Sequence, residues 1–206
     1  MNPPRPRAIL FDVGETLVDE TTCWSCWADA MRVPRLTFFT VPGALIAQGR
    51  SHRAVFSHFD PDFDPAREDA GEPYEIPATS LYPDALPCIA ALRAQGLFVG
   101  IAGNQPKGSE AALARVGIEA DGLGSSHTWG VSKPDTRFFD RIVAESGFAP
   151  AEVVHVGDRY DNDVAPARAA GLRAIWLHRG PWAHLRTAPA HVERIDSLTE
   201  LPTRLA

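Results

Sequence analysis

Acidic side chains follow two short apolar runs of the sequence, and a lysine lies between these runs in the chain. Asp12 comes directly after the first run, and Asp158 and Asp163 follow the later one. Lys133 is one of only two lysines, so nearly all basic residues are arginines. Clustered carboxylates repel one another unless a cation neutralises them, and hard oxygen ligands suit Mg²⁺. These residue types predict a site where carboxylates hold Mg²⁺ beside a fixed ammonium group.

Each of these features alone has an ordinary structural explanation. An aspartate often ends a strand before a turn, a single lysine is usually solvated, and an aspartate can cap the helix that follows. A helix cap accounts for one acid, however, and three acidic residues lie within the six positions from Asp158 to Asp163. The combination with Asp12 and Lys133 is therefore what predicts a functional site.

The elements that must position these residues follow from the hydrophobic pattern. Four nearly continuous apolar runs predict strands buried on both faces of a parallel sheet, at 8–13, 97–102, 153–156 and 172–177. Helix-like segments lie between them, at 83–94, 109–116, 134–146 and 161–170. The alternation predicts an α/β fold, a Rossmann-like parallel sheet with helices on both faces. Ligands bind such sheets at the carboxyl ends of the strands, where the acids and the lysine would meet.

The interval from 20 to 81 interrupts this alternation. It contains amphipathic, aromatic-rich stretches and then a segment rich in Pro, Asp and Glu, without a strand-like run. A crossover between parallel strands needs only about a dozen residues. We therefore predict a helical cap over 20–81, inserted into an α/β core domain made of 1–19 and 82–206.

With these motifs, the sequence resembles the haloacid dehalogenase superfamily over nearly its whole length. Asp12, in Phe-Asp-Val-Gly-Glu-Thr-Leu, stands at the position of the nucleophile, and Lys133, in Lys-Pro-Asp, looks like the third motif. The segment from Gly157 through Asp163 matches the fourth motif, G-D-x-x-x-x-D, with its spacing intact. The predicted insert looks like a C1-type helical cap.

The resemblance implies covalent catalysis, in which Asp12 attacks a phosphoryl group and water hydrolyses the aspartyl-phosphate. It also implies a Mg²⁺ ion held by the Asp12 carboxylate, the Gly14 carbonyl and Asp158, with Asp163 in the first or second ligand shell. Lys133 would pair with Asp12 and with the transferred oxygens. By analogy with the family, the expected partner is a small phosphorylated metabolite.

Two positions depart from the family pattern. The residue two places after the nucleophile is an aspartate in the family's phosphatases, where it protonates the leaving oxygen, but here it is Gly14, and Glu15 is offset by one residue. The Ser or Thr of the second motif aligns with Gly103, so the Asn104 side chain and backbone N–H groups are expected to bind phosphate together with Lys133. General acid catalysis contributes about 10²–10⁴-fold. The sequence therefore leaves a weak, specialised or inactive enzyme open.

The runner-up functions are a dehalogenase of small haloacids and a noncatalytic binding protein with the same fold. Dehalogenases of the superfamily also lack the second aspartate, but they need no metal, whereas the pair Asp158 and Asp163 indicates one. Phosphonate hydrolases of the superfamily need a cap lysine, and 20–81 contains none. Receiver domains carry their acidic pair after the first strand rather than late in the chain. A Mg²⁺-dependent phosphatase is the favoured reading.

Composition narrows the partners and the compartment. The 206 residues carry a net charge of −6, which argues against nonspecific binding to nucleic acid or to an anionic membrane. The sequence has no run of about 18 apolar residues, so it predicts no membrane-spanning helix. Three cysteines, Cys23, Cys26 and Cys88, are too few for a disulfide scaffold, which favours a reducing cytoplasm. Cys23 and Cys26 form a CxxC without the second pair that a zinc site would need.

Overall fold

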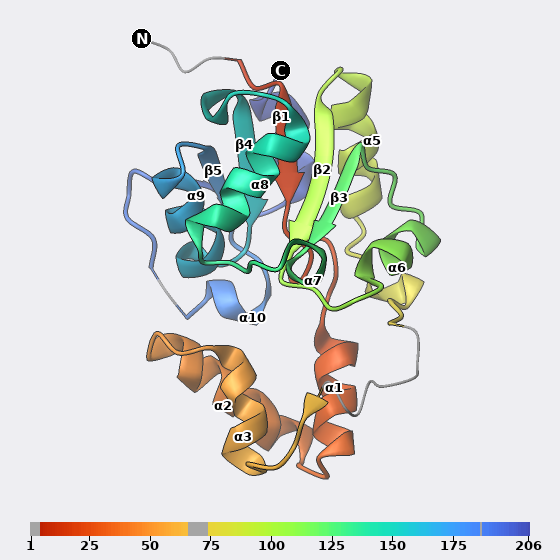
Figure 1. The fold of residues 1–206 in the computed structure, drawn as a ribbon, viewed down its shortest axis with the longest axis vertical. Helices are drawn as coiled ribbons and strands as arrows, with labels where there is room; N and C mark the ends of the chain where they lie inside the picture. The colour runs from red at the N-terminus through yellow and green to blue at the C-terminus, as the bar shows by residue number, and fades with distance from the viewer. Residues whose placement is uncertain (1–4, 66–73, 186) are drawn as a thin grey trace.

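The computed structural model describes residues 5–65, 74–185 and 187–206. Its centre is a six-stranded sheet with the order β3-β2-β1-β4-β5-β6, and every neighbouring pair of strands is parallel (Figure 1). The strands are β1 (Ala8–Phe11), β2 (Phe98–Gly103), β3 (Gly122–Ser125), β4 (Val153–Gly157), β5 (Arg173–Leu177) and β6 (Glu193–Ile195). This confirms the predicted Rossmann-like fold.

Alternate residues of each strand face two separate apolar cores. In β1, Ile9 and Phe11 pack in one cluster with α5 (Ala85–Ala94), α6 (Ser109–Arg115) and α11 (Leu201–Arg204). Ala8 and Leu10 pack on the other face with α8 (Thr136–Ser146) and α9 (Ala165–Ala169). Because both faces are covered, β1 is buried at every position and its sequence reads as a continuous apolar run.

Short helical segments complete the fold between these larger elements. They are the π-helical turn η4 (Tyr160–Val164), the α-helices α7 (Ser126–Trp129) and α10 (Gly180–Ala183), and the 3₁₀ turns η2 (Ala78–Ser80), η3 (Pro150–Glu152) and η5 (Leu198–Glu200). The predicted helix over 161–170 thus consists of η4 followed by α9. Among the residues that the structure describes, no helix combines the length and the apolar character needed to cross a bilayer.

The edge strands β3 and β6 were not predicted by the apolar pattern. β3 has the sequence Gly-Leu-Gly-Ser and β6 has only three residues, Glu-Arg-Ile. Each lies at one edge of the sheet and pairs with a single neighbour, so it needs no continuous apolar run. Their strand character comes from pairing with β2 and β5.

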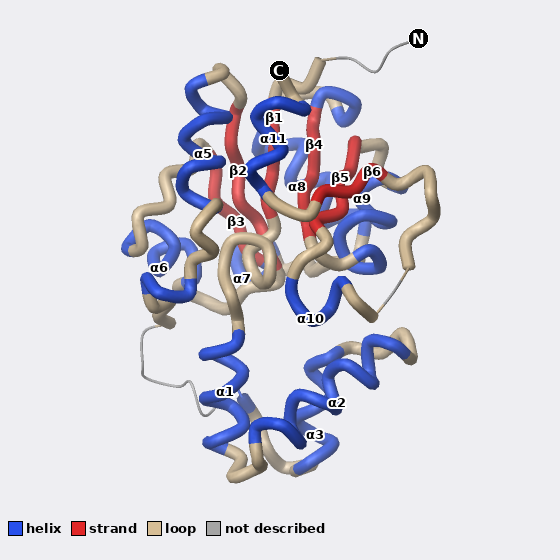
Figure 2. The backbone as a smooth tube through the Cα atoms, turned by 180° about the vertical axis from the view of Figure 1, so that it is seen from behind, coloured by secondary structure: helices blue, strands red, loops and turns tan. Residues whose placement is uncertain are grey.

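Between β1 and α5, residues 20–59 form a separate helical group, called the insert below. It contains α1 (Thr21–Ala30), α2 (Arg35–Ala47), the 3₁₀ turn η1 (His52–Ala54) and α3 (Val55–Phe59). Its own apolar core holds most of the aromatic side chains predicted there: Trp24, Phe38 and Phe56, with Trp27, Phe39 and Phe59 packed against them. Figure 2 shows these helices beyond the carboxyl ends of the strands. Residues 66–73 of the predicted cap lie outside the described residues.

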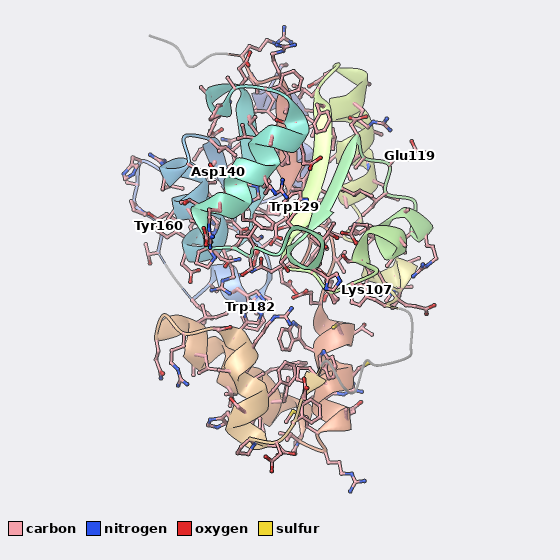
Figure 3. All side chains as sticks on the ribbon, in the orientation of Figure 1. Lys107, Glu119, Trp129, Asp140, Tyr160 and Trp182 are labelled. Atoms are coloured by element: carbon pink, nitrogen blue, oxygen red, sulfur yellow. The ribbon has the colours of Figure 1, made fainter. Side chains whose placement is uncertain are left out.

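Side chains connect the core and the insert. The ring of Trp182, from α10, lies 6.3 Å from that of Trp24 and 6.2 Å from that of His52, centroid to centroid, and Figure 3 shows Trp182 between the sheet and the insert. Arg159 donates a hydrogen bond from Nη1 to Nδ1 of His52, at 3.0 Å. Arg53 donates to the carbonyl oxygen of Asn104, at 3.3 Å. The insert therefore closes over the strand ends.

Acidification is expected to weaken the fold through His52. Burial and the Arg159 guanidinium lower the pKa of His52 to about 3, because a proton on Nδ1 would displace the hydrogen bond and face a cation. The unfolded chain binds this proton below about pH 6.5, so the free energy of unfolding decreases as the pH falls from 6.5 towards 3. Between pH 7 and pH 5 the wild type should lose about 1–2 kcal/mol more than His52→Gln in urea unfolding. Parallel pH dependences of the two proteins would contradict this.

Candidate active site

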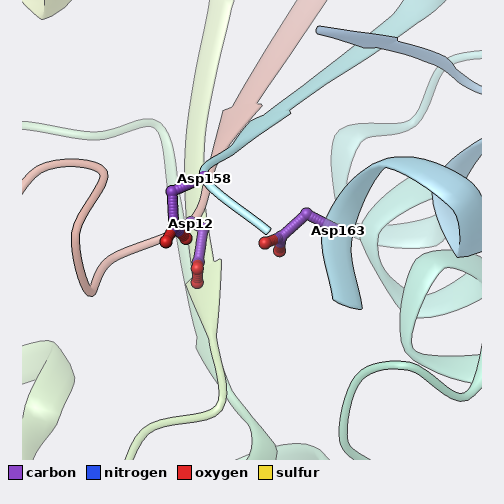
Figure 4. A group of neighbouring side chains, drawn as sticks. All are labelled: Asp12, Asp158 and Asp163. Carbon is purple, nitrogen blue, oxygen red and sulfur yellow. The ribbon is translucent and has the colours of Figure 1, made fainter. Parts of the chain in front are cut away.

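Four charged side chains meet at the carboxyl edge of the sheet, and Figure 4 shows the three carboxylates among them. Asp12 directly follows β1, where its N–H donates to the carbonyl oxygen of Val156 at 2.9 Å, and Asp158 directly follows β4. Asp163 turns towards them from η4, and Lys133 comes from the loop before α8. All four are buried, with exposed fractions of 7% for Asp12, 3% for Lys133, 1% for Asp158 and 0% for Asp163.

The Lys133 ammonium group bridges two of the carboxylates. Its Nζ lies 2.6 Å from Oδ1 of Asp12 and 2.5 Å from Oδ1 of Asp163. Burial alone would lower the pKa of Lys133, but the two carboxylates outweigh burial and raise it. Lys133 is therefore a permanent positive charge beside Asp12.

Asp163 is held from three sides. Besides Lys133, the Arg159 N–H donates to its Oδ2 at 3.1 Å, and Nε2 of His155 lies 3.3 Å from its Oδ1. Burial would raise the pKa of Asp163, but Lys133 and His155 outweigh burial and lower it. A Cβ at position 157 would overlap the Asp163 side chain, which explains the glycine of the Gly-Asp motif. His155 is fully buried in β4, and its contact with Asp163 is a result of the fold.

The Asp158 carboxylate, unlike those of Asp12 and Asp163, forms no ion pair with Lys133. Its Oδ2 is buried and has no hydrogen-bond partner among the described residues. Burial, together with repulsion from Asp163 and Asp12, raises the pKa of Asp158 well above its ordinary value. One oxygen from each of the three carboxylates lies within 4.8 Å of the others, and two ligands of one Mg²⁺ are at most about 4.2 Å apart. A divalent cation fits here, because it would satisfy the orphaned oxygen after only small side-chain movements.

Two carboxyl groups, those of Glu15 and Glu20, lie close to Gly14 and Asp12. Gly14 has no side chain, and the Glu15 carboxylate accepts hydrogen bonds from the Tyr82 hydroxyl at 2.7 Å and from the Glu20 N–H at 3.0 Å. Burial and repulsion from Glu15 and Asp12 raise the pKa of Glu20 to about 7, although Trp24 donates a hydrogen bond to its carboxylate. No sequence motif marks Glu20, whose place beside the site depends on the path of the chain into α1.

The second-motif positions lie beside Asp12 and Lys133. A Cβ on Gly103 would lie 2.8 Å from Oδ1 of Asp12, so the glycine leaves room for the carboxylate in this position. The Asn104 amide is engaged with the Lys133 backbone: Oδ1 accepts from its N–H at 2.8 Å, and Nδ2 donates to its carbonyl oxygen at 2.9 Å. Asn104 thus holds the loop that carries Lys133.

A cavity of about 640 Å³ opens between the strand ends and the insert. Lys133 lines it together with three arginines, of which Arg50 and Arg53 come from the insert and Arg159 from the core. Arg35, by contrast, is exposed and pairs with Asp29 at 2.7 Å. Asp161 also lines the cavity and pairs with Arg159 at 2.8 Å, so the excess positive charge comes from Lys133, Arg50 and Arg53. This excess suits a small anionic ligand, and the volume falls within the usual range of small-molecule sites.

Comparisons with known proteins agree with this arrangement. The family profile of the haloacid dehalogenase-like hydrolases matches residues 6–171. The chain therefore belongs to the haloacid dehalogenase-like hydrolases. The match spans all four side chains of the buried cluster, from Asp12 to Asp163.

Individual curated relatives match only part of the chain, and a solved structure of the same fold has low sequence identity. The chain is 36% identical over 107 residues to phosphoserine phosphatase of Thermus thermophilus, covering 48% of this chain and 41% of that one. It is 32% identical over 124 residues to glyceraldehyde 3-phosphate phosphatase of Methanocaldococcus jannaschii, covering 58% and 54%. The magnesium-bound HAD-hydrolase YfnB of Bacillus subtilis has the same fold, with a TM-score of 0.73 and 19% identity over 98% of this chain and 99% of that one. The chain thus spans about half the length of the curated relatives it matches.

Proposed function

We propose that this protein is a Mg²⁺-dependent phosphatase that hydrolyses a small phosphorylated metabolite through an aspartyl-phosphate on Asp12. The observation that carries the proposal is the buried cluster, in which Lys133 bridges Asp12 and Asp163 while Asp158 keeps an orphaned oxygen. Three buried carboxylates and one ammonium group leave an excess of negative charge that a divalent cation would neutralise. Two of the relatives are phosphatases of small metabolites, which supports the same reaction class.

In the proposed reaction, a carboxylate oxygen of Asp12 attacks the phosphorus of the ester, and the bond between phosphorus and the leaving oxygen breaks. Water then attacks the phosphorus of the aspartyl-phosphate and releases inorganic phosphate and free Asp12. Lys133 holds the Asp12 carboxylate in place and offsets the charge of the transferred oxygens. The raised pKa of Lys133 means that the substrate meets a charged ammonium group beside Asp12.

The metal ion would be held by Asp12, the Gly14 carbonyl and Asp158, with Asp163 in the first or second ligand shell. When bound, Mg²⁺ lowers the repulsion between the anionic nucleophile and the anionic phosphate. Asp163 also contacts Nζ of Lys133, through Oδ1. The Arg159 N–H donates to Oδ2 of Asp163 and so keeps this carboxylate in the orientation that holds Lys133.

The cavity indicates the kind of ester. Backbone N–H groups at Gly103 and Asn104 would contact the phosphate beside Lys133. Arg50 and Arg53 line the cavity together with Asn104 and Lys133, so a second negative group on the substrate would be bound by guanidinium groups. We propose the insert, 20–81 by sequence, as the cap that selects this substrate.

A panel of small phosphate esters tests this function. It should include phosphoserine, phosphoglycolate and glyceraldehyde 3-phosphate, and it should be assayed with Mg²⁺ and with a chelator. We expect phosphate release that requires Mg²⁺ and that is abolished in Asp12→Asn, because an amide cannot act as the nucleophile. A haloacid panel is the control. Halide release without phosphate release would favour a dehalogenase, and no turnover of either panel would favour a binding protein.

A further inference from the structure

The Glu20 side chain fills the space that a side chain at position 14 would occupy. A Cβ built on Gly14 would lie 2.5 Å from both Cδ and Oε1 of Glu20 and 2.9 Å from its Oε2. The carboxyl carbon of an aspartate lies about 1.5 Å from its own Cβ. The Glu20 carboxyl group therefore occupies the small region that a carboxyl group from position 14 would enter, two residues after Asp12.

The backbone at Glu20 is anchored to the core. The Glu20 N–H donates to Oε1 of Glu15 at 3.0 Å, and the Asp19 N–H donates to the carbonyl oxygen of Ser80 at 2.7 Å. Val18, two residues earlier, forms β-bridges with Gly14 and with Leu81. Glu20 precedes the first residue of α1, so it leaves the core at a fixed point although it begins the insert.

The carboxyl group itself is oriented by one hydrogen bond. Nε1 of Trp24, one turn further along α1, donates to Oε2 at 3.1 Å. Trp24 is packed against Phe56 and Trp182, with ring centroids 6.2 and 6.3 Å away, so its indole is held in place. Oε1 accepts no hydrogen bond from the described residues, so its capacity to exchange a proton is not taken up by a neighbouring donor.

We propose that Glu20 is the catalytic acid and base that Gly14 cannot be, an inference that rests on the proposed phosphatase function. As the bond between phosphorus and the leaving oxygen breaks, the Glu20 carboxyl group gives its proton to that oxygen, and an alcohol leaves instead of an alkoxide. The Glu20 carboxylate then takes a proton from the water that attacks the aspartyl-phosphate, which restores the carboxyl group. One ester and one water give one alcohol and one phosphate.

The leaving group decides how much this proton matters. Nitrophenolate departs without a proton, whereas an alkoxide needs one. Glu20→Gln keeps the size of the side chain but cannot donate the proton of an acid. We expect it to lower kcat/KM for an alkyl phosphate by about 10²–10⁴-fold and that for nitrophenyl phosphate only a few-fold, because kcat/KM reports the steps up to departure of the leaving group and not the later attack of water. The ratio of the two rates in one protein does not depend on the folded fraction, so partial unfolding cannot produce this result.

Two further variants separate catalysis from packing. Glu145→Gln, at an exposed site on α8, makes the same chemical change and should leave the ratio unaltered. The double variant Gly14→Asp/Glu20→Ala places a carboxyl group at position 14 after clearing its space, and it should recover part of the alkyl-phosphate turnover. Gly14→Asp alone should bring no gain, since the Glu20 carboxyl group already fills this space and already supplies the acid.

The outcomes distinguish this inference from the function on which it rests. If the wild type is active and Asp12→Asn is not, but Glu20→Gln lowers kcat/KM for both substrates equally or for neither, Glu20 is not the acid and the phosphatase function stands. If the wild type hydrolyses neither ester, or if Asp12→Asn retains the activity, the proposed function and the role of Glu20 are both overturned.

Discussion

Lys133→Met is expected to destabilise the protein by about 3–5 kcal/mol, the usual loss when one partner of a buried ion pair is removed. The substitution keeps an unbranched apolar side chain but takes away the ammonium group that lies 2.6 Å from Asp12 and 2.5 Å from Asp163. Both carboxylates would then be buried without their cation, next to Asp158, whose pKa is already raised. Urea unfolding without added metal measures the difference in the free energy of unfolding.

The other lysine provides the matched control. Lys107 is exposed, as Figure 3 shows, and Lys107→Met should change the free energy of unfolding by no more than about 0.5 kcal/mol. Added Mg²⁺ should recover part of the stability lost in Lys133→Met, because the ion supplies positive charge to the same carboxylates. Equal stability of the two variants would mean that the buried charges are not coupled as the distances indicate.

Asp158→Asn is expected to change stability in opposite directions with and without Mg²⁺. The raised pKa of Asp158 means that its carboxylate destabilises the metal-free fold at any pH above the ordinary range of an aspartate. The amide removes that penalty, so metal-free Asp158→Asn should melt at a higher temperature than the metal-free wild type. It also removes an anionic ligand, and we expect Mg²⁺ affinity to fall by at least the roughly 10–100-fold typical of outer-shell changes.

Calorimetric titration with Mg²⁺ and thermal unfolding at several Mg²⁺ concentrations measure both effects. The melting temperature of the wild type should rise with Mg²⁺ and finally exceed that of Asp158→Asn, which should hardly respond. Asp140→Asn, at an exposed position on α8, serves as the control and should follow the wild type. Equal Mg²⁺ affinity of wild type and Asp158→Asn, or no binding to either, would remove Asp158 from the metal site.

The sequence by itself determined the central strands and the residues at their ends. Strands that are buried on both faces are apolar at nearly every position, so β1, β2, β4 and β5 stand out as short, nearly continuous apolar runs. Parallel strands bring their carboxyl ends to one edge, which places Asp12 and Asp158 together without knowledge of any loop. The spacing to Asp163 and the scarcity of lysine then identified the remaining charges of the cluster.

Only the tertiary structure decided the features that depend on contacts between distant segments. Pairing with a neighbouring strand, rather than composition, makes β3 and β6 strands. The Asn104 amide is committed to the Lys133 backbone, 29 residues away, and no local pattern reveals such a contact. Glu20 reaches the space above Gly14 because the chain leaves β1 through an anchored turn before α1 begins. A residue type and its spacing specify strands and their ends, whereas the path of the chain between them decides which side chain fills a vacant position.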